Sequence, residues 1–420
     1  MLNVLSLFSG IGAFEKALTN LNVPYNLVGF CEVDKYAAES YCAIHGVSAD
    51  KNLGDITKVD ETALAKDIDV LTYGFPCQDI SISGRQIGLF DEDGALTRSG
   101  LFFEALRIIE ATKPKIAIAE NVKNLVSKKF TEQFQLVLHS LEAAGYNNYW
   151  QVLNAKDFGV PQNRERVFIV SIRKDVDKGN FKFPAPIPLG KRLKDVLDDE
   201  VDEKYYLSDK MVNYIFEVTK SNRQRGNGNV FSPSDEEGCA KTVTTKEGCR
   251  VKDNFIVQGK RVINVGNVNP SGRGQNGNVI DSQGLARTVT QEHGEGQKIL
   301  VRDWETAKCI GGFGEKKSNG GQQFYQQDRV YQGDIALAHP ASIPGGSYRY
   351  AVDEAQSMRI RKLTPKECFR LMGFDDESFH RAEAVNSNTQ LYKQAGNSIV
   401  VDVLEHLFRN LLNESGEIDV

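Results

Sequence analysis

The sequence contains no uninterrupted apolar run long enough to cross a membrane, and this absence excludes a membrane-spanning helix as its organising element. Its first residues, MLNVLSLFSGIGAFEKAL, lack the basic segment with which a signal peptide begins, and their apolar stretch leads directly into a Gly-rich turn. We therefore expect a cytoplasmic protein with no membrane partner.

Cysteine pairs and a large excess of charge of one sign are also lacking. The seven cysteines are odd in number and none stands in a CxxC pair, so we expect reduced thiols and no metal site. The formal net charge of −5 argues against a surface coated with basic residues. It leaves room for a local basic surface that binds nucleic acid.

The length of 420 residues exceeds that of a typical single domain, and the composition is that of an ordinary globular protein. Over residues 1–175 short apolar runs alternate with helical patterns, which is typical of a doubly wound α/β sheet. The expected strands are 4–8, 27–31, 69–73, 115–119 and 166–172, and the expected helices are 13–21, 101–111 and 130–144. Ligands bind at the carboxyl ends of the strands in such sheets, so polar residues there are the candidates for a site.

The character of the sequence changes after about residue 180. A Pro-rich connection, FKFPAPIPLG, precedes residues 221–350, whose Gly, Asn, Ser, Thr and β-branched content predicts a β-rich second domain. Helical patterns return at 364–372 and 398–412. The second domain contains an internal repeat, expected to form hairpins that stabilise one another by stacking. Its copies lead from 227–231 to 240–244, from 276–280 to 286–290, and more weakly from 328–331 to 336–338.

The turn Phe8-Ser9-Gly10-Ile11-Gly12 lies between the first strand and the first helix. Glycines there let the backbone approach a ligand, and the helix N-terminus adds donors, although such turns also occur for packing reasons. Glu15 replaces the last glycine of the GxGxxG pattern. An acid facing a pyrophosphate is unfavourable, which favours a cofactor without phosphates.

Two acids follow this turn at the expected ligand edge. Glu32 can accept hydrogen bonds from both hydroxyls of a ribose, and Asp55 can accept one from an adenine amino group. Each acid taken alone is more often a helix cap or a solvated loop residue. Together and in this order they favour an adenosine-type cofactor.

Cys77 and Glu120 follow two further strands. Most cysteines pack in cores, but Cys77 lies beyond its strand, in a turn that should place it in the cleft. A thiolate that adds to C6 of cytosine makes C5 enamine-like, and cysteine is the side chain best able to do this near neutral pH. Glu120 can give a proton to N3 if burial raises its pKa, although a helix-capping acid is a common alternative.

Arg164 and Arg166 alternate in an extended segment, which predicts that both project to one face, suited to phosphate or base oxygens. A salt-bridged strand edge is the alternative. Residues 81–88, after Cys77, have glycines on both sides of polar residues. They are expected to form a mobile loop that closes over a substrate, with an ordinary surface loop as the alternative.

These clusters resemble the ordered motifs of the cytosine-5 DNA methyltransferase family. The matching blocks are FSGIGAFE (8–15), CEVD (31–34), GDI (54–56), GFPCQDIS (74–81), SGLFFE (99–104), AENV (119–122), QNRERVFIV (162–170), RKLTPKECFRLMGF (361–374) and QAGNSIVVDV (394–403). Nine blocks in order are far more specific than PCQ alone. The PCQ block also differs from the loop of methyltransferases that modify exocyclic amino groups.

The resemblance implies a Rossmann-like, S-adenosylmethionine-dependent methyltransferase domain and a smaller β-rich target-recognition domain, with DNA between them. Residues 1–180 and 391–420 are expected to form the catalytic domain, and 181–390 the recognition domain and hinge. The implied catalytic residues are Cys77 as nucleophile, Glu120 as the N3 proton donor, and Arg164 and Arg166 in the pocket. The implied cofactor contacts are Phe8, Gly10, Gly12, Glu32, Asp55, Pro76, Asn397 and Ser398.

A target base in double-stranded DNA must be flipped out of the helix, and the loop residues Ser81, Ser83, Arg85 and Gln86 are expected to contact the DNA. Basic residues cluster around the Thr-Val-Thr repeats, so Arg225, Thr242 and Thr288 are further expected contacts. The repeats form either one recognition surface, which we favour because the units are close in sequence, or separate modules for separate sites. A third possibility is that they only stabilise a small β domain.

Three other functions remain in competition. A tRNA cytosine methyltransferase would use the same pocket, but the large β-rich insert favours reading of a duplex. An NAD-type oxidoreductase is disfavoured by Glu15 and the PCQ loop, and a non-catalytic DNA-binding module by intact Cys77 and Glu120. We expect a monomeric prokaryotic or phage-encoded enzyme of restriction-modification or orphan type, without a restriction endonuclease in stable complex.

Overall fold

The computed structural model of the protein describes residues 1–81, 84, 86–226, 228, 230–258, 264–267, 278–281, 298–300, 308–312, 329–332 and 359–414. The chain divides into two compact units, Met1–Ile256 with Lys362–Val420, and Val257–Arg361. The boundaries of these compact units therefore differ from the predicted domain boundaries, because residues 181–256 and 362–390 belong to the first unit. One reason is that Leu193 and Val196 are buried in the same apolar core as Phe369.

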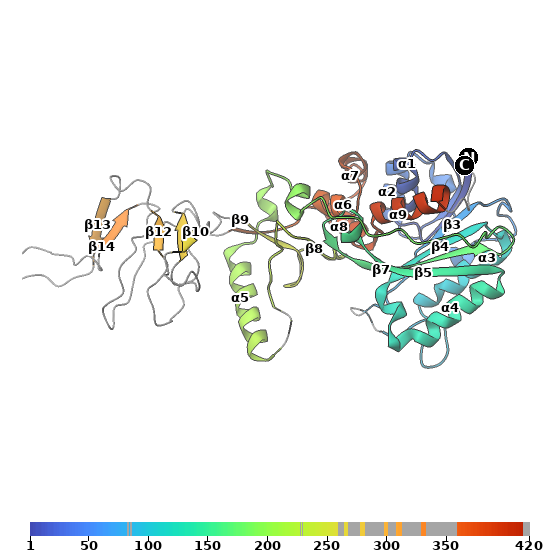
Figure 1. Cartoon of the computed structure of the whole chain (residues 1–420), viewed down its shortest axis with the longest axis horizontal. Coiled ribbons are helices and arrows are strands. Elements are labelled where there is room, and N and C mark those ends of the chain that lie inside the picture. Colours follow the sequence, from blue (N-terminus) through green and yellow to red (C-terminus); the bar gives the residue numbers. More distant parts are fainter. Residues whose placement is uncertain are drawn as a thin grey trace, which may run out of the picture. The chain divides into compact units, whose positions relative to one another are not determined.

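A six-stranded sheet forms the centre of the first unit, in the order β2-β1-β3-β4-β7-β5 (Figure 1). Its strands are β1 (Leu2–Leu7), β2 (Tyr25–Cys31), β3 (Val70–Tyr73), β4 (Ile116–Val122), β5 (Tyr146–Asn154) and β7 (Glu165–Arg173). The first four are parallel, whereas β7 runs antiparallel to both β4 and β5. The α/β fold predicted from the sequence is confirmed, and the structure adds that its sheet is mixed because β7 is antiparallel.

Apolar cores cover both faces of this sheet, because successive residues of a strand point to opposite sides. On β1, Val4 packs with helices α1 (Ala13–Asn20) and α9 (Val401–Arg409). The next residue, Leu5, packs with α3 (Phe102–Thr112) and α4 (Thr131–Ala143). Figure 1 shows α1 and α9 on one side of the sheet and α4 on the other. Helix α2 (Lys35–His45) follows β2.

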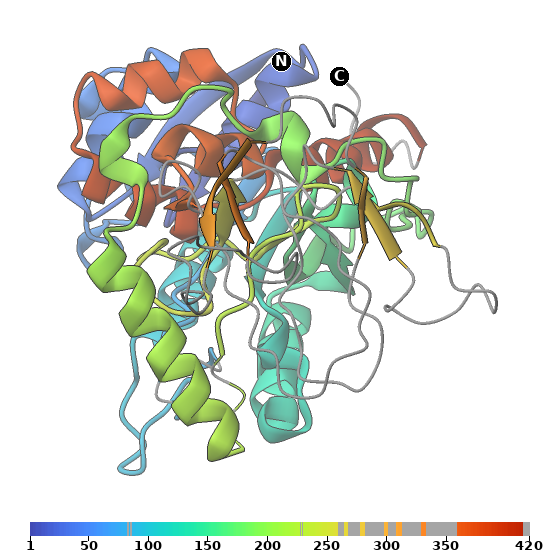
Figure 2. The same ribbon diagram turned by 90° about the vertical axis from the view of Figure 1, so that its left-hand side faces the viewer.

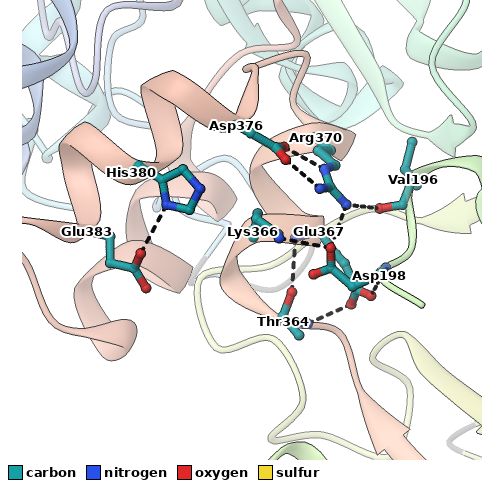
Figure 3. A network of polar contacts seen from close by, with 9 residues as sticks. All are labelled: Val196, Asp198, Thr364, Lys366, Glu367, Arg370, Asp376, His380 and Glu383. Atoms are coloured by element: carbon teal, nitrogen blue, oxygen red, sulfur yellow. Dashed lines mark hydrogen bonds and ion pairs between the residues drawn. The ribbon is translucent and has the colours of Figure 1, made fainter. Parts of the chain in front are cut away.

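The C-terminal segment supplies α6 (Pro365–Leu371), α7 (Asp376–Glu383), α8 (Asn388–Asn397) and α9. Helix α6 begins with a capping box in which Thr364 and Glu367 each accept from the other's backbone N–H. Glu367 also accepts from the backbone N–H of Asp198, and the Asp198 carboxylate lies 2.9 Å from Arg370 (Figure 3). This polar network fixes the segment around residue 198 to α6 within the first unit.

Helix α5 (Asp209–Gln224), uninterrupted in Figure 2, precedes the first sequence repeat. Of residues 230–244, which are all described, only 240–241 form a strand, β8 (Ala240–Lys241). The hairpin expected for this copy is therefore wrong. The ring of Phe231 instead lies 5.9 Å from that of Phe216 on α5 and 5.7 Å from that of Phe255. Strand β8 pairs in parallel with β6 (Gln162–Asn163).

The described residues of the second unit lie in short strands. Strands β10 (Asn264–Asn267), β11 (Asn278–Asp281) and β12 (Lys298–Leu300) form one sheet, and β13 (Lys308–Gly312) pairs with β14 (Arg329–Gln332). Strands β9 (Phe255–Gln258) and β15 (Arg359–Lys362) pair where the unit begins and ends. In the described part of the chain no helix combines the length and apolarity that a membrane crossing requires.

Candidate active site

The register of the sheet gathers the predicted site residues at one edge. Leu7 lies opposite both Cys31 and Tyr73, and Tyr73 lies opposite Ala119. The residues that follow these four along the chain are Phe8, Glu32, Gly74 and Glu120. Strand pairing alone therefore brings the turn at Phe8, the acid Glu32, the Cys77 loop and Glu120 to the carboxyl end of the parallel strands, where α/β sheets bind their ligands.

The turn after β1 is joined directly to Glu32. Phe8, Gly10 and Gly12 all have left-handed backbone conformations, with φ of 53°, 56° and 79°. The Gly10 N–H donates to Glu32 Oε2 over 2.8 Å, and the Asp34 N–H donates to Glu32 Oε1 over 2.7 Å. Burial raises the pKa of Glu32, and these amide donors oppose the shift. The turn and the acid thus form one preorganised edge.

His45 supports this turn and was not identified from the sequence. Its Nε2 lies 3.0 Å from the carbonyl oxygen of Ile11, and a Cβ added to Gly12 would collide with the same nitrogen. Glycine at position 12 is therefore required twice, by its φ and by the close approach of His45. Burial lowers the pKa of His45 to about 4, so the ring is neutral near pH 7.

Glu15 does not face the ligand edge, which corrects the argument made from its position in the motif. Its side chain is 1% exposed, and both carboxylate oxygens lie inside the protein beside Ser6 and Tyr41. Burial raises the pKa of this carboxyl. Glu15 therefore bears on packing beneath the turn, and its charge does not select between phosphate-containing and phosphate-free cofactors.

Asp55 is tied to Glu32 through Asn52, another residue that the sequence did not single out. Asn52 Oδ1 accepts from the N–H groups of Glu32 and Gly54, and its Nδ2 donates to the Glu32 carbonyl over 3.0 Å. The Asp55 carboxylate caps a short 3-10 helix by accepting from the N–H and hydroxyl of Thr57. These two hydrogen bonds lower the pKa of the exposed Asp55. Its capping role is established by the structure, and a ligand contact remains a prediction.

Backbone and side-chain hydrogen bonds within the first unit hold the Cys77 loop. The Cys77 carbonyl accepts from the N–H groups of Ile80 and Ser81, which makes one helical turn after the cysteine. Asn121 Nδ2 donates to the Phe75 carbonyl over 3.0 Å, and Asn124 Nδ2 donates to the Ile80 carbonyl over 2.6 Å. Asn121, on the strand that carries Glu120, and Asn124, in the turn after that strand, therefore hold the chain before and after Cys77.

The electrostatic surroundings of the thiol are mixed. Burial raises the pKa of Cys77, and the carboxyl of Glu120 raises it further. The guanidinium groups of Arg166 and Arg164 act in the opposite direction.

Pro76 and Ser81 beside the cysteine are half-buried, and Gln86 has a left-handed φ of 55°. The predicted DNA contacts Ser83 and Arg85 lie outside the described residues.

Glu120 and Arg166 form a close pair. Arg166 Nε lies 2.9 Å from Glu120 Oε1, across the β4–β7 pairing in which Val122 is opposite Arg166. Burial raises the pKa of Glu120, while the charges of Arg166 and Arg164 lower it. The Glu120 side chain keeps 13% of its surface exposed.

Arg164 has a different environment from Arg166, although the sequence predicts that both project to one face. Its guanidinium donates to three backbone carbonyls, those of Val243, Gly396 and Ser398, over 3.0, 3.0 and 2.7 Å. Its Nε is buried and has no hydrogen-bond partner in the described part of the chain. Burial, followed by the Arg166 charge, lowers the pKa of Arg164 to about 9.

Residues of the first Thr-Val-Thr repeat bind the two residues that precede Arg164. The Thr242 hydroxyl donates to the Asn163 carbonyl over 2.7 Å, and the Val243 N–H donates to Gln162 Oε1 over 3.0 Å. Thr242 also lines a cavity of about 610 Å³. The other lining residues are Lys156, Asn163, Cys239, Ala240 and Lys241.

The remaining predicted residues are placed as follows. Ser398 is buried: its hydroxyl donates to the Ile399 carbonyl, and its own carbonyl accepts from Arg164. Its neighbour Asn397 is exposed. Arg225 is exposed at the C-terminus of α5. Thr288 lies outside the described residues. The six cysteines whose side chains are described are all unpaired.

Comparison with known proteins first defines the class. The fold is similar to the crystal structure of the S. pombe Dnmt2 methyltransferase, with a TM-score of 0.53 and 18% identity over 99% of each chain. The family model for the C-5 cytosine-specific DNA methylase matches residues 2–413. The chain belongs to this family and is a DNA (cytosine-5) methyltransferase, in a family that generally uses S-adenosylmethionine.

Two curated relatives show which kinds of DNA methyltransferase the chain is similar to. The chain is 36% identical to the orphan methyltransferase M.SPRI of Bacillus phage SPR, over 98% of each sequence. It is 30% identical to the type II methyltransferase M2.ScrFI of Lactococcus lactis subsp. cremoris, over 98% of this chain and 99% of the relative. The relatives thus include both orphan phage enzymes and restriction-modification enzymes.

Proposed function

We propose that the protein transfers a methyl group to C5 of a cytosine in a specific sequence of double-stranded DNA, through a covalent adduct between the Cys77 thiolate and C6. The observation that supports this most directly is the pairing of Arg166 with Glu120 over 2.9 Å beside the Cys77 thiol. A nucleophile, a proton donor and a cation are thereby joined in one place.

The chemistry requires two linked changes in the ring. The Cys77 thiolate forms a bond to C6, the electron pair of the C5–C6 double bond moves between C4 and C5, and that of the C4–N3 double bond moves to N3, which takes a proton from Glu120. C5 is then an enamine carbon that can accept a methyl group. Loss of the C5 proton to a base afterwards restores the C5–C6 double bond and expels the Cys77 thiolate. The raised pKa of Glu120 keeps a proton available, because burial disfavours the charged carboxylate. Arg166 holds the carboxyl in place and stabilises the carboxylate after the proton has left.

The cofactor proposed is S-adenosylmethionine, which when bound supplies an electrophilic methyl group on a sulfonium. The residues fit such a group: Glu32 uses two lone pairs on the amides of Gly10 and Asp34, and a carboxylate has further acceptor capacity for ribose hydroxyls. Val33 next to it is 77% exposed and offers an apolar surface for an adenine ring. Phe8, Gly12, Asp55, Pro76, Asn397 and Ser398 complete the proposed set.

The DNA partner is proposed to lie against the Cys77 loop and the recognition repeats. The target cytosine would be flipped into the site, at a cost of a few kcal/mol, with residues 81–88 closing over the duplex. Arg225 and Thr242 are retained as proposed contacts, although the Thr242 hydroxyl already binds the Asn163 carbonyl. We further propose a monomeric cytoplasmic enzyme whose cognate endonuclease, where one exists, is not stably bound.

Methylation assays with labelled cofactor on duplex DNA and on tRNA test the proposed substrate. Transfer to duplex DNA that is lost in Cys77→Ser is the expected result, because a hydroxyl is much less readily ionised than a thiol. Transfer to tRNA with none to DNA would contradict it. Bisulfite sequencing of DNA from cells that produce the protein would then identify the methylated sequence.

A further inference from the structure

We propose that Glu247 and Asn254 are positioning residues that set the placement of Arg164 for methyl transfer, acting through residues 241–244. The inference rests on the proposed role of Arg164 in the catalytic pocket. Neither side chain belongs to the motifs recognised in the sequence, and both are buried, at 2% and 0% exposed.

Glu247 organises the loop that follows the first Thr-Val-Thr repeat. Its Oε2 accepts from the Thr244 N–H over 2.9 Å. Its Oε1 accepts from the backbone N–H of Asn254 over 2.6 Å and from the Asn254 side chain over 3.2 Å. One carboxylate therefore fixes the end of the repeat and the far side of the loop together.

Asn254 continues this arrangement along the chain. Its Oδ1 accepts from the Lys241 N–H over 2.8 Å and from the Ser234 hydroxyl over 2.9 Å, and its Nδ2 donates to the Lys241 carbonyl over 3.2 Å. A single side chain thus satisfies both backbone groups of Lys241 on one side, as a neighbouring strand would. The other side of β8 pairs with β6, where Lys241 lies opposite Asn163.

Residues 241–244 in turn hold Arg164. The Val243 carbonyl accepts from Arg164 Nη1, while the Val243 N–H binds Gln162, two residues before the arginine. A Cβ added to Gly396, whose carbonyl also holds Arg164, would collide with the backbone of Thr244 and Thr245. The position of Thr244 is therefore linked sterically and by hydrogen bonds to the guanidinium, and Glu247 is the group that fixes Thr244.

The surroundings of Glu247 make its charged form unfavourable. Burial raises its pKa to about 7, and the carboxyl of Asp253 adds to the shift. Among the described residues, Lys241, Cys368 and Tyr392 also interact electrostatically with it. A buried acid that keeps three N–H donors despite this cost indicates that the hydrogen bonds specify a geometry.

The test compares Glu247→Gln and Asn254→Ala with Asp253→Asn in the full-length chain. Asp253 is a matched control, because it is a buried acid of the same loop whose carboxylate accepts from the N–H groups of Cys249 and Arg250, on the far side of the loop from Thr244. Single-turnover methylation, S-adenosylmethionine affinity by calorimetry and the thermal midpoint are measured for each. We expect transfer by Glu247→Gln and Asn254→Ala to slow by about tenfold or more with unchanged cofactor affinity, since small misplacements of catalytic groups are costly. Asp253→Asn should lower the thermal midpoint without this loss.

A double-mutant cycle with Arg164→Lys then tests the route of the effect. Rate losses that fail to multiply in the Arg164→Lys/Glu247→Gln protein are expected when both act on one arrangement. If the rate losses multiply, or if Glu247→Gln transfers methyl groups as fast as Asp253→Asn, Glu247 does not position Arg164. Either result would leave the proposed role of Arg164 itself unaffected. Wild-type transfer by Arg164→Lys would instead show that the proposed role of Arg164 is wrong.

Discussion

Arg166 Nε lies 2.9 Å from Glu120 Oε1, and the two side chains retain only 17% and 13% of their surface exposed. A pair this close would ordinarily hold the acid ionised, yet burial outweighs the cation and the pKa of Glu120 is raised. The carboxyl is thus oriented by a cation without being committed to the charged form, which is what a proton donor requires.

Replacing Glu120 by glutamine is expected to slow methyl transfer strongly. The amide keeps a hydrogen-bonding group at the site but has no proton to give, and loss of a general acid typically costs about 10² to 10⁴ in rate. Single-turnover methylation of duplex DNA measures the effect. The control is Glu165→Gln, the neighbouring acid that pairs with Lys123 on the surface, and it should methylate at the wild-type rate. Equal rates in the two variants would remove Glu120 from the proton-donor role.

Glu32→Ala and Asp55→Ala are expected to weaken S-adenosylmethionine binding more than DNA binding. Each change removes hydrogen bonds to a charged acceptor, and for the buried Glu32 the loss is about 1.5–3 kcal/mol. Asp60→Ala is the matched control, because Asp60 caps its turn through Thr62 as Asp55 does through Thr57. If calorimetry gives the same cofactor affinity for Asp55→Ala and Asp60→Ala, Asp55 is only a cap.

Gly396→Ala is expected to reduce methylation by displacing the segment that holds Arg164. An added Cβ would meet backbone atoms of Thr244 and Thr245, which cannot rotate away as a flexible side chain would. Gly190→Ala serves as the control, since a Cβ there meets nothing within 4 Å. Methylation and the thermal midpoint are measured for both proteins. A fully active Gly396→Ala enzyme would show that this close approach is not required.

The recognition repeats are tested by replacing Thr242-Val243 and Thr288-Val289 with alanine separately, followed by bisulfite sequencing. A single recognition surface predicts that both changes reduce methylation at the same sequence. Loss of a different methylated sequence in each variant would support separate modules. Unchanged methylation in both would leave the repeats a stabilising role only. The structure already separates the first copy from simple stacking, because Val243 is buried against the main body and its carbonyl binds Arg164.

The sequence predicted the central sheet because strand ends carry a strong pattern. Apolar runs followed by Gly, acid or Cys located β1 to β4 within a few residues, and register then forces their ends together. Helix α2 was missed although Asp34 caps its start and Gly46 ends it in a left-handed conformation. Helix α5 was not predicted, because its mainly polar residues give a weak apolar pattern and its last residues overlap the segment 221–350 that was expected to be β-rich, despite the Ser208 cap.

The contacts around the site could not be predicted in the same way. Glu15 has the sequence position of a ligand-facing residue, but only the rotation of α1 shows that its carboxyl points inward. The Arg164 carbonyl partners come from residues 79, 232 and 234 positions away in the chain. Glu247 and Asn254 act on neighbouring backbone, and no residue spacing distinguishes them from solvated loop residues.

Trapping with duplex DNA that carries 5-fluorocytosine at the target tests the central claim most directly. Fluorine cannot leave C5 as a proton does, so the thiolate mechanism predicts a covalent protein–DNA complex that survives denaturing electrophoresis, forms only with cofactor present, and is absent in Cys77→Ser. Mass spectrometry should place the DNA on Cys77. Active methylation of ordinary cytosine by the same preparation, with no stable adduct on the fluorinated duplex, would contradict the mechanism.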